Sequence, residues 1–129
     1  TEENKMIFET KKILGCGKIA VSATCVRVPV FFCHAENVVF TTKKKADVNS
    51  VKQALSSAPG VILCEKDEKF PTPTEVEGKD EVFVGRVRQC RGEKNTFSAW
   101  VVADNVRKGA ATNAVQIAEK LISFRESLQ

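Results

Sequence analysis

Residues able to do chemistry gather in three parts of this chain of 129 residues. The first part holds Glu2 and Lys5, the second is the run of residues 24–34, and the third is the run of residues 104–111. Glu2 and Lys5 are three positions apart and therefore share one face of a helix, where they can present one negative and one positive group to a ligand. This pattern suits a zwitterionic or phosphorylated ligand.

The second run contains an arginine, a cysteine and the only histidine. Arg27 stands between two valines, and a guanidinium taken out of water needs an anion, either a ligand carboxylate or a core carboxylate in a structural salt bridge. His34 leaves a similar choice between an acid/base and a hydrogen-bonded core imidazole. Cys33 is its neighbour, but adjacent residues of an extended chain point to opposite sides, so the sulfur and the ring should diverge. The run supplies a base without a nucleophile.

Composition narrows the class of protein. The chain has 20 Lys and Arg against 16 Asp and Glu, a net charge of +4, and is 43% hydrophobic, which is enough for one core. It has no apolar stretch of about 18 residues and no signal-peptide core, so we expect a soluble, cytoplasmic protein with no membrane partner. The lysine run at residues 43–45 is interpreted as a solvated strand end, and no nucleic-acid partner is expected.

The cysteines exclude two further kinds of site. The 5 cysteines form no Cys-x-x-Cys pair and are accompanied by a single histidine. This pattern fits neither a disulfide framework nor a zinc site, so we expect no metal.

Hydrophobic periodicity predicts the elements that position these residues. Helices are expected over residues 2–14, 46–58 and 106–121, and strands over residues 19–32, 37–42, 61–64, 81–89 and 96–103. We expect the first two strands to pair about residues 33–36, the last two to form a hairpin, and residues 66–80 to form a long surface loop. Asp104 or Asn105 is the expected cap of the last helix. This order predicts an α+β fold, a mixed, largely antiparallel sheet with helices on one face.

Two long strings carry a family resemblance. The string ATCVRVPVFFCHAENV, followed further along by FSAWVVADNVRKGAATNAVQIAEKL, resembles the C-terminal part of the aspartate-β-semialdehyde dehydrogenases, and EENKMIFETKKIL resembles the helix before it. The resemblance implies the C-terminal domain fold of the glyceraldehyde-3-phosphate dehydrogenase-like enzymes. It makes residues 1–129 a substrate-binding and dimerisation fragment. A Gly-rich nucleotide-binding turn and the segment of the family's catalytic cysteine are absent from the chain, so we expect a piece of a longer enzyme.

The family's chemistry implies a role for each matched residue. An active-site cysteine attacks the aldehyde of aspartate semialdehyde, hydride passes to NADP, and phosphate releases the thioester as aspartyl phosphate. In the cell the reaction runs in reverse, toward lysine, threonine and methionine. The resemblance implies that His34 is the general acid/base, that Arg27 and Glu2 bind the substrate carboxylate and amino group, and that Lys5 binds phosphate. It places Asn105 at the nicotinamide end of NADP, and it implies a homo-oligomer, either a dimer or a tetramer.

The residues also qualify the resemblance. Alternation along a strand puts Arg27 and His34 on opposite faces, so they converge only if the chain breaks register between them, and Pro29 is the expected place. Cys33-His34-Ala35 stands where the family usually has Gly-His-Ser, so a small residue and a hydroxyl are both lost.

Other functions stay open at this point. One is a sibling acyl-phosphate reductase, such as the N-acetyl-glutamyl-phosphate or glyceraldehyde-3-phosphate enzymes. Another is a non-catalytic dimerisation or scaffold module. The Glu-x-x-Lys helix and the Asn-x-x-Lys-Gly-Ala-Ala string favour the aspartate enzyme.

Overall fold

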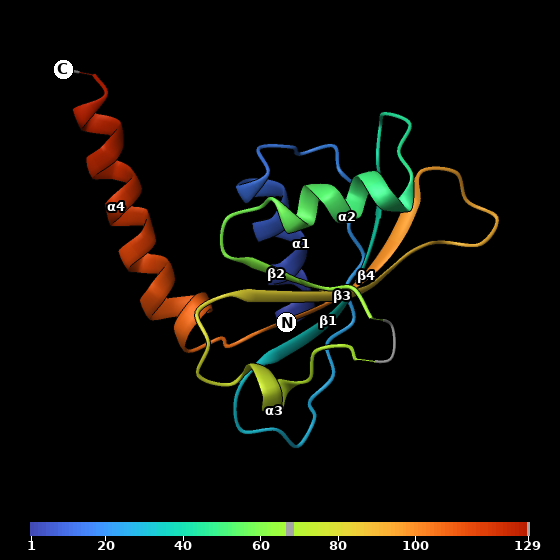
Figure 1. Cartoon of the computed structure of the whole chain (residues 1–129), viewed down its shortest axis with the longest axis horizontal. Helices are drawn as coiled ribbons and strands as arrows, with labels where there is room; N and C mark the ends of the chain where they lie inside the picture. Colours follow the sequence, from blue (N-terminus) through green and yellow to red (C-terminus); the bar gives the residue numbers. More distant parts are fainter. Residues whose placement is uncertain (67–68, 129) are drawn as a thin grey trace.

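The computed structural model of this chain describes residues 1–66 and 69–128. Its elements follow in the order α1 (Glu2–Ile13), β1 (His34–Thr41), α2 (Val48–Ser56), β2 (Val61–Cys64), α3 (Pro73–Val76), β3 (Val82–Gln89), β4 (Thr96–Ala103), a π-helical turn (Arg107–Ala111) and α4 (Thr112–Glu126). The strands form one 4-stranded sheet in the order β1-β4-β3-β2 (Figure 1). β4 pairs antiparallel with both β1 and β3, whereas β2 is parallel to β3. The α+β class with a mixed, largely antiparallel sheet is confirmed.

The main core lies between α2 and one face of the sheet. Asp47 caps α2, because its side chain accepts the backbone N–H of Ser50 while the Ser50 hydroxyl accepts the N–H of Asp47. Val51 then packs against apolar side chains of the two central strands, which are Val84, Val87, Phe97 and Ala99. Phe97 and Ala99 share a face because they are two residues apart. Val84 and Val87 are three residues apart, and they share this face because the register of β3 shifts between Gly85 and Arg88.

The other face of the sheet is covered near the Ala103 end of β4. Figure 1 shows the single turn of α3 on the side of the sheet away from α2. Val76 of α3 is buried with Val102 and Cys33, and Phe83 and Trp100 pack beside them. This smaller cluster ties the residue before β1 to the centre of the sheet.

The strand expected over residues 19–32 is wrong, and so is its pairing about residues 33–36. Residues 18–33 form no strand, and β1 begins at His34 and pairs with β4. Pro29 has no N–H to give to a ladder, and the N–H of Val30 donates to the carbonyl of Val28 (2.9 Å), which bends the chain. The Val and Phe content of this segment reflects an exposed apolar surface, not a buried strand.

The other expected elements differ mainly at their ends. α1, α2 and β3 fall within the predicted ranges, β1 begins earlier than predicted, and β2 and β4 match their predicted bounds. The loop expected over residues 66–80 contains α3, and its residues 67–68 lie outside the described part of the chain. The last helix opens with a π-helical turn and runs on to Glu126.

Two helices leave their apolar sides uncovered within this chain. Neither α1 nor α4 has a buried residue, and Figure 1 shows α4 projecting away from the sheet. The most exposed apolar side chains lie on these helices, just after α4 and on the segment before β1, and they include Phe8, Ile13, Val26, Phe31, Phe124 and Leu128. Within the described residues, the model contains no helix that is both long and apolar enough to cross a membrane.

Gly85 lets Pro71 pack closely against β3, on the side of the sheet that α3 covers. A Cβ at this position would lie 2.9 Å from Cδ of Pro71. Gly85 pairs in register with Trp100, whose indole N–H donates to the carbonyl of Pro71 (2.9 Å). The backbone of Pro71 is therefore held against β3 and has little room to move away.

We expect Gly85→Ala to lower the free energy of unfolding by about 1–3 kcal/mol, because the added methyl overpacks a tight contact. Gly17→Ala is the matched control, since a Cβ there meets nothing within 4 Å. Urea denaturation followed by circular dichroism measures both variants. Equal stability of the two variants would contradict this account of the packing.

Candidate functional site

The sheet places His34 next to Asn105. His34 opens β1 and pairs in register with Ala103, the last residue of β4. Just before it, the backbone N–H of Cys33 donates to Oδ1 of Asn105 (2.9 Å), across a separation of 72 residues. His34 and Asn105 are both exposed, so both side chains are accessible to a ligand.

Cys33 is a structural residue, not the partner of His34 in a catalytic pair. Its side chain is 8% exposed, whereas that of the neighbouring His34 lies at the surface. Burial raises the pKa of the Cys33 thiol, and the negative charges of Asp104 and Glu77 raise it further. A thiol with a raised pKa is a poor nucleophile at neutral pH. The divergence expected between the Cys33 sulfur and the His34 ring agrees with this difference in burial, and the role of His34 as a base stays a prediction.

Asp104 holds the turn that carries Asn105. The Asp104 side chain is 3% exposed and accepts the backbone N–H groups of Val106 (2.9 Å) and Arg107 (3.1 Å), as a helix cap does. Its second oxygen accepts the N–H of Gly78 (2.8 Å), from the turn that follows α3. These hydrogen bonds, that of Gly78 first, lower the pKa of Asp104. Of the two expected caps, Asp104 takes the role, and this leaves the side chain of Asn105 available.

A second carboxylate binds side chains at both ends of the π-helical turn. Asp80 accepts two hydrogen bonds from the guanidinium of Arg107, each 2.8 Å long, and a third from the hydroxyl of Thr112. The hydrogen bond from Arg107, followed by that from Thr112, lowers the pKa of Asp80 to about 2. The ion pair therefore stays formed across the neutral range of pH. Isolated π-helical turns are frequent at functional sites.

Sequence reasoning missed Asp80, Thr112 and the π-helical turn. The turn has no periodic signature in the string RKGAA, and Asp80 stands at the end of a charged loop. Only the folded chain brings Asp80 beside Arg107.

Glu2, Lys5 and Arg27 form a second group. The carboxylate of Glu2 lies 3.6 Å from Nζ of Lys5, and both side chains are exposed. Glu3 accepts the backbone N–H of Cys25 (3.1 Å), and Sγ of Cys25 lies 3.4 Å from the sulfur of Met6. The first half of α1 therefore lies along the segment that leads to Arg27.

Arg27 itself is exposed, and no carboxylate of the described residues forms an ion pair with it. The structural salt bridge that could have explained this arginine is therefore not found within the described residues. Because residues 18–33 form no strand, strand alternation no longer sets Arg27 and His34 on opposite faces. Among the described contacts, no hydrogen bond or ion pair joins the Arg27 group to the pair of His34 and Asn105.

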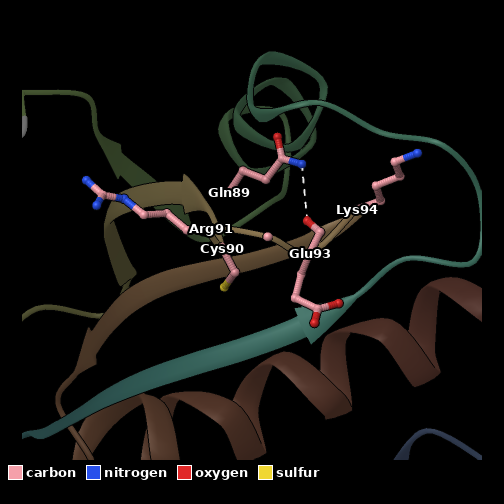
Figure 2. A pocket seen from close by; sticks show the side chains of 6 residues that line it. Gln89, Cys90, Arg91, Glu93 and Lys94 are labelled. Atoms are coloured by element: carbon pink, nitrogen blue, oxygen red, sulfur yellow. Dashed lines mark hydrogen bonds between the residues drawn. The ribbon is translucent and has the colours of Figure 1, made fainter.

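A shallow, open hollow in the described surface lies elsewhere. It is lined by residues 89–94, in the turn between β3 and β4, where Gln89 donates to the carbonyl of Glu93 (3.3 Å) (Figure 2). This turn is at the opposite end of β4 from Asn105, and none of the expected site residues lines the hollow. In the part of the chain that the structure describes, no cluster of three or more His, Cys, Asp or Glu could hold a metal ion.

Comparison with known proteins identifies the family. The family model described as semialdehyde dehydrogenase, dimerisation domain, matches residues 1–108. The aspartate-semialdehyde dehydrogenase of Aquifex aeolicus is 52% identical over 123 residues, which cover 94% of this chain and 36% of that protein. This chain belongs to the semialdehyde dehydrogenase family, whose dimerisation domain it matches. The Bacillus subtilis member is 46% identical over 123 residues, 93% of this chain and 36% of its own length.

Solved structures of the family share the fold. The crystal structure of aspartate semialdehyde dehydrogenase II complexed with ASA from Vibrio cholerae matches with a TM-score of 0.90 at 49% identity, over 95% of this chain and 37% of that chain. A probable aspartate-semialdehyde dehydrogenase from Pseudomonas aeruginosa matches with a TM-score of 0.83 at 34% identity, over 93% of this chain and 36% of that chain. The chain thus spans little more than a third of the length of these relatives.

The difference between the cysteines is open to a direct test. Cys25 is exposed, whereas Cys33 is buried and has a raised pKa, so we expect iodoacetamide at neutral pH to alkylate Cys25 at least about tenfold faster. Peptide mass spectrometry after timed quenching measures both rates, and the urea-unfolded chain, in which the rates should converge, is the control. Faster labelling of Cys33 would show that it is an activated thiol.

Proposed function

We propose that this chain is the substrate-binding and dimerisation part of an aspartate-semialdehyde dehydrogenase. The whole enzyme interconverts aspartyl phosphate and aspartate semialdehyde plus phosphate, with NADP as the cofactor. The observation that carries the proposal is the hydrogen bond between Cys33 and Asn105, because it brings the only histidine beside the residue that the family resemblance assigns to the cofactor. The nucleotide-binding domain and the acylating cysteine belong to parts of the enzyme outside this chain.

Arg27, Glu2 and Lys5 bind the substrates in this proposal. The exposed guanidinium of Arg27 has no carboxylate partner among the described residues and can grip the substrate carboxylate through two parallel hydrogen bonds. The contact between Glu2 and Lys5 is 3.6 Å long and exposed, so separating the two costs little. Glu2 then accepts hydrogen bonds from the substrate ammonium group, and Lys5 pairs with phosphate. Fixing the substrate at several points lowers the entropic part of the barrier.

His34 moves the proton. When NADP is bound, it supplies the hydride chemistry of the reaction. In the direction of oxidation, His34 takes the proton from the hydroxyl of the adduct that the enzyme's cysteine forms with the aldehyde, and in the direction of reduction it returns this proton, as a positioned acid/base does. Its exposed ring reaches a ligand without any rearrangement of β1.

Asn105 suits the carboxamide end of NADP. Its Oδ1 is occupied by the N–H of Cys33, and no acceptor for its Nδ2 is found among the described residues. Because Asn105 is exposed, this amide N–H group can donate to a carboxamide carbonyl. The donor that the chain leaves free therefore fits the cofactor.

We expect His34→Ala in the full-length enzyme to lower kcat by about 10²- to 10⁴-fold, the usual contribution of a positioned acid/base. Arg27→Leu should mainly raise KM for aspartate semialdehyde, since it removes the guanidinium that binds the substrate carboxylate. Arg91→Leu is the matched control, an exposed arginine in the turn between β3 and β4. The assay follows NADPH by absorbance. A His34→Ala enzyme with kcat within a few-fold of wild type would refute the assignment of the base.

We also expect this chain to form a homo-oligomer, a dimer or a tetramer. The matched family model is a dimerisation domain, and apolar side chains such as Val39 and Phe31 are exposed along β1 and the segment before it. Sedimentation equilibrium at tens of micromolar measures the assembly. Val39→Lys, which puts a charge on the edge strand β1, should weaken it, whereas Val115→Lys on α4 is a control of equal charge. A monomer at every concentration would favour a non-catalytic scaffold over the proposed role.

A further inference from the structure

Cys33 has a backbone conformation that it does not adopt without support. Its φ is 73°, in the left-handed region that residues with a Cβ rarely occupy. It stands at the junction between the irregular segment of residues 18–33 and β1, and the next residue is His34. A strained conformation of this kind persists only when the surrounding structure holds it.

Two contacts hold Cys33 in place. Its N–H donates to Oδ1 of Asn105 (2.9 Å), and its side chain is buried with Val76 and Val102. Turning the backbone of Cys33 to an ordinary conformation would change the direction of its N–H and break the hydrogen bond to Asn105. The position of Asn105 and the conformation of Cys33 therefore depend on each other.

Asn105 in turn is held by its neighbour Asp104. The buried carboxylate of Asp104 accepts the N–H groups of Gly78, Val106 and Arg107, so it fixes the backbone on both sides of Asn105 relative to the turn after α3. The ion pair between Asp80 and Arg107 holds the same π-helical turn from its other side. Asp104 itself is buried and does not reach a ligand.

We propose that Asp104 and Asn105 act as positioning residues for His34, because together they hold Cys33 in its left-handed conformation and so set where the next residue presents its imidazole. This inference rests on the proposed function of His34 as the acid/base. It gives Asn105 a second task, in which its Oδ1 positions His34 while its Nδ2 remains for the cofactor. The alternative is that Asp104 only stabilises the fold.

The test uses Asp104→Asn in the full-length enzyme. This change keeps the size of the side chain but replaces one acceptor oxygen with an N–H₂ group, so one tie to the backbone is lost. We expect kcat to fall about tenfold or more with little change in KM for aspartate semialdehyde, because a small misplacement of a catalytic group is costly.

A second substitution separates positioning from stability. Glycine adopts φ of 73° without strain, so Cys33→Gly in the Asp104→Asn background should restore most of the lost kcat. Cys33→Ala is the matched control, since it also removes the sulfur but keeps the Cβ, and it should restore nothing. Equal behaviour of the two double variants would overturn the proposal.

Asp47→Ala controls for lost stability. Asp47 also caps a helix, but it stands beyond the Thr41 end of β1, away from His34. We expect this variant to lower Tm without lowering kcat, and we expect Cys33→Gly not to act on it. If Asp104→Asn behaved in the same way, with a lower Tm and an unchanged kcat, Asp104 would be a structural residue only.

NMR gives an independent readout, because His34 is the only histidine of this chain. The imidazole signal in a ¹H–¹³C spectrum of this 129-residue chain should shift in Asp104→Asn and return in the Cys33→Gly double variant. Should Asp104→Asn fail to fold, Thr112→Val removes one donor to Asp80 and should produce the same shift in a weaker form. An unmoved signal in a folded variant would contradict the proposal.

The two hypotheses fail in different ways. An active His34→Ala enzyme would refute the proposed function. An inactive His34→Ala enzyme beside an Asp104→Asn enzyme of normal kcat would refute the positioning role alone.

Discussion

One hydrogen bond, from the N–H of Cys33 to Oδ1 of Asn105, joins the residue before β1 to the turn after β4. It fixes the point where an irregular segment enters the sheet, and it sets His34 beside the π-helical turn. The bond links parts of the chain that are distant in sequence, which the pairing of β1 with β4 brings together. The buried carboxylate of Asp104 accepts three backbone hydrogen bonds and so holds the turn that carries Asn105. In the proposed function, the position of His34 thus depends on a contact in which His34 itself takes no part.

The chain divides into a closed core and a set of uncovered apolar surfaces. α2 and the central strands bury their apolar side chains as an independent domain does. α1, the segment before β1 and α4 do not, and they expose large side chains such as Phe31 and Phe124. Exposed apolar surface of this extent is typical of contact regions. The family relatives are nearly three times as long as this chain, and the matched family model is a dimerisation domain. The exposed apolar surface is therefore available for contact with the rest of a longer chain or with a second copy.

Local patterns predicted the elements whose burial follows from their own periodicity, namely α2, β2, β3 and β4. Local patterns wrongly predicted a strand over residues 19–32. β propensity reflects the content of hydrophobic, branched side chains, and it does not show whether a partner strand exists. The pairing of β1 with β4 and the role of Asp104 depend on distant contacts, which no window of sequence contains. The left-handed conformation of Cys33 was not predicted either; the glycine that the family resemblance implies at this position is the signal that indicates it. The roles of Glu2, Lys5, Arg27, His34 and Asn105 came from the family resemblance, and they remain predictions.

The most direct measurement is a crystal structure of the full-length enzyme with aspartate semialdehyde bound. The account predicts that the substrate carboxylate lies on Arg27 and its carbonyl oxygen within hydrogen-bond distance of the His34 ring. It also predicts that Cys33 keeps a positive φ and its bond to Asn105. A substrate bound away from both Arg27 and His34, or a Cys33 in extended conformation with Asn105 turned away, would contradict it.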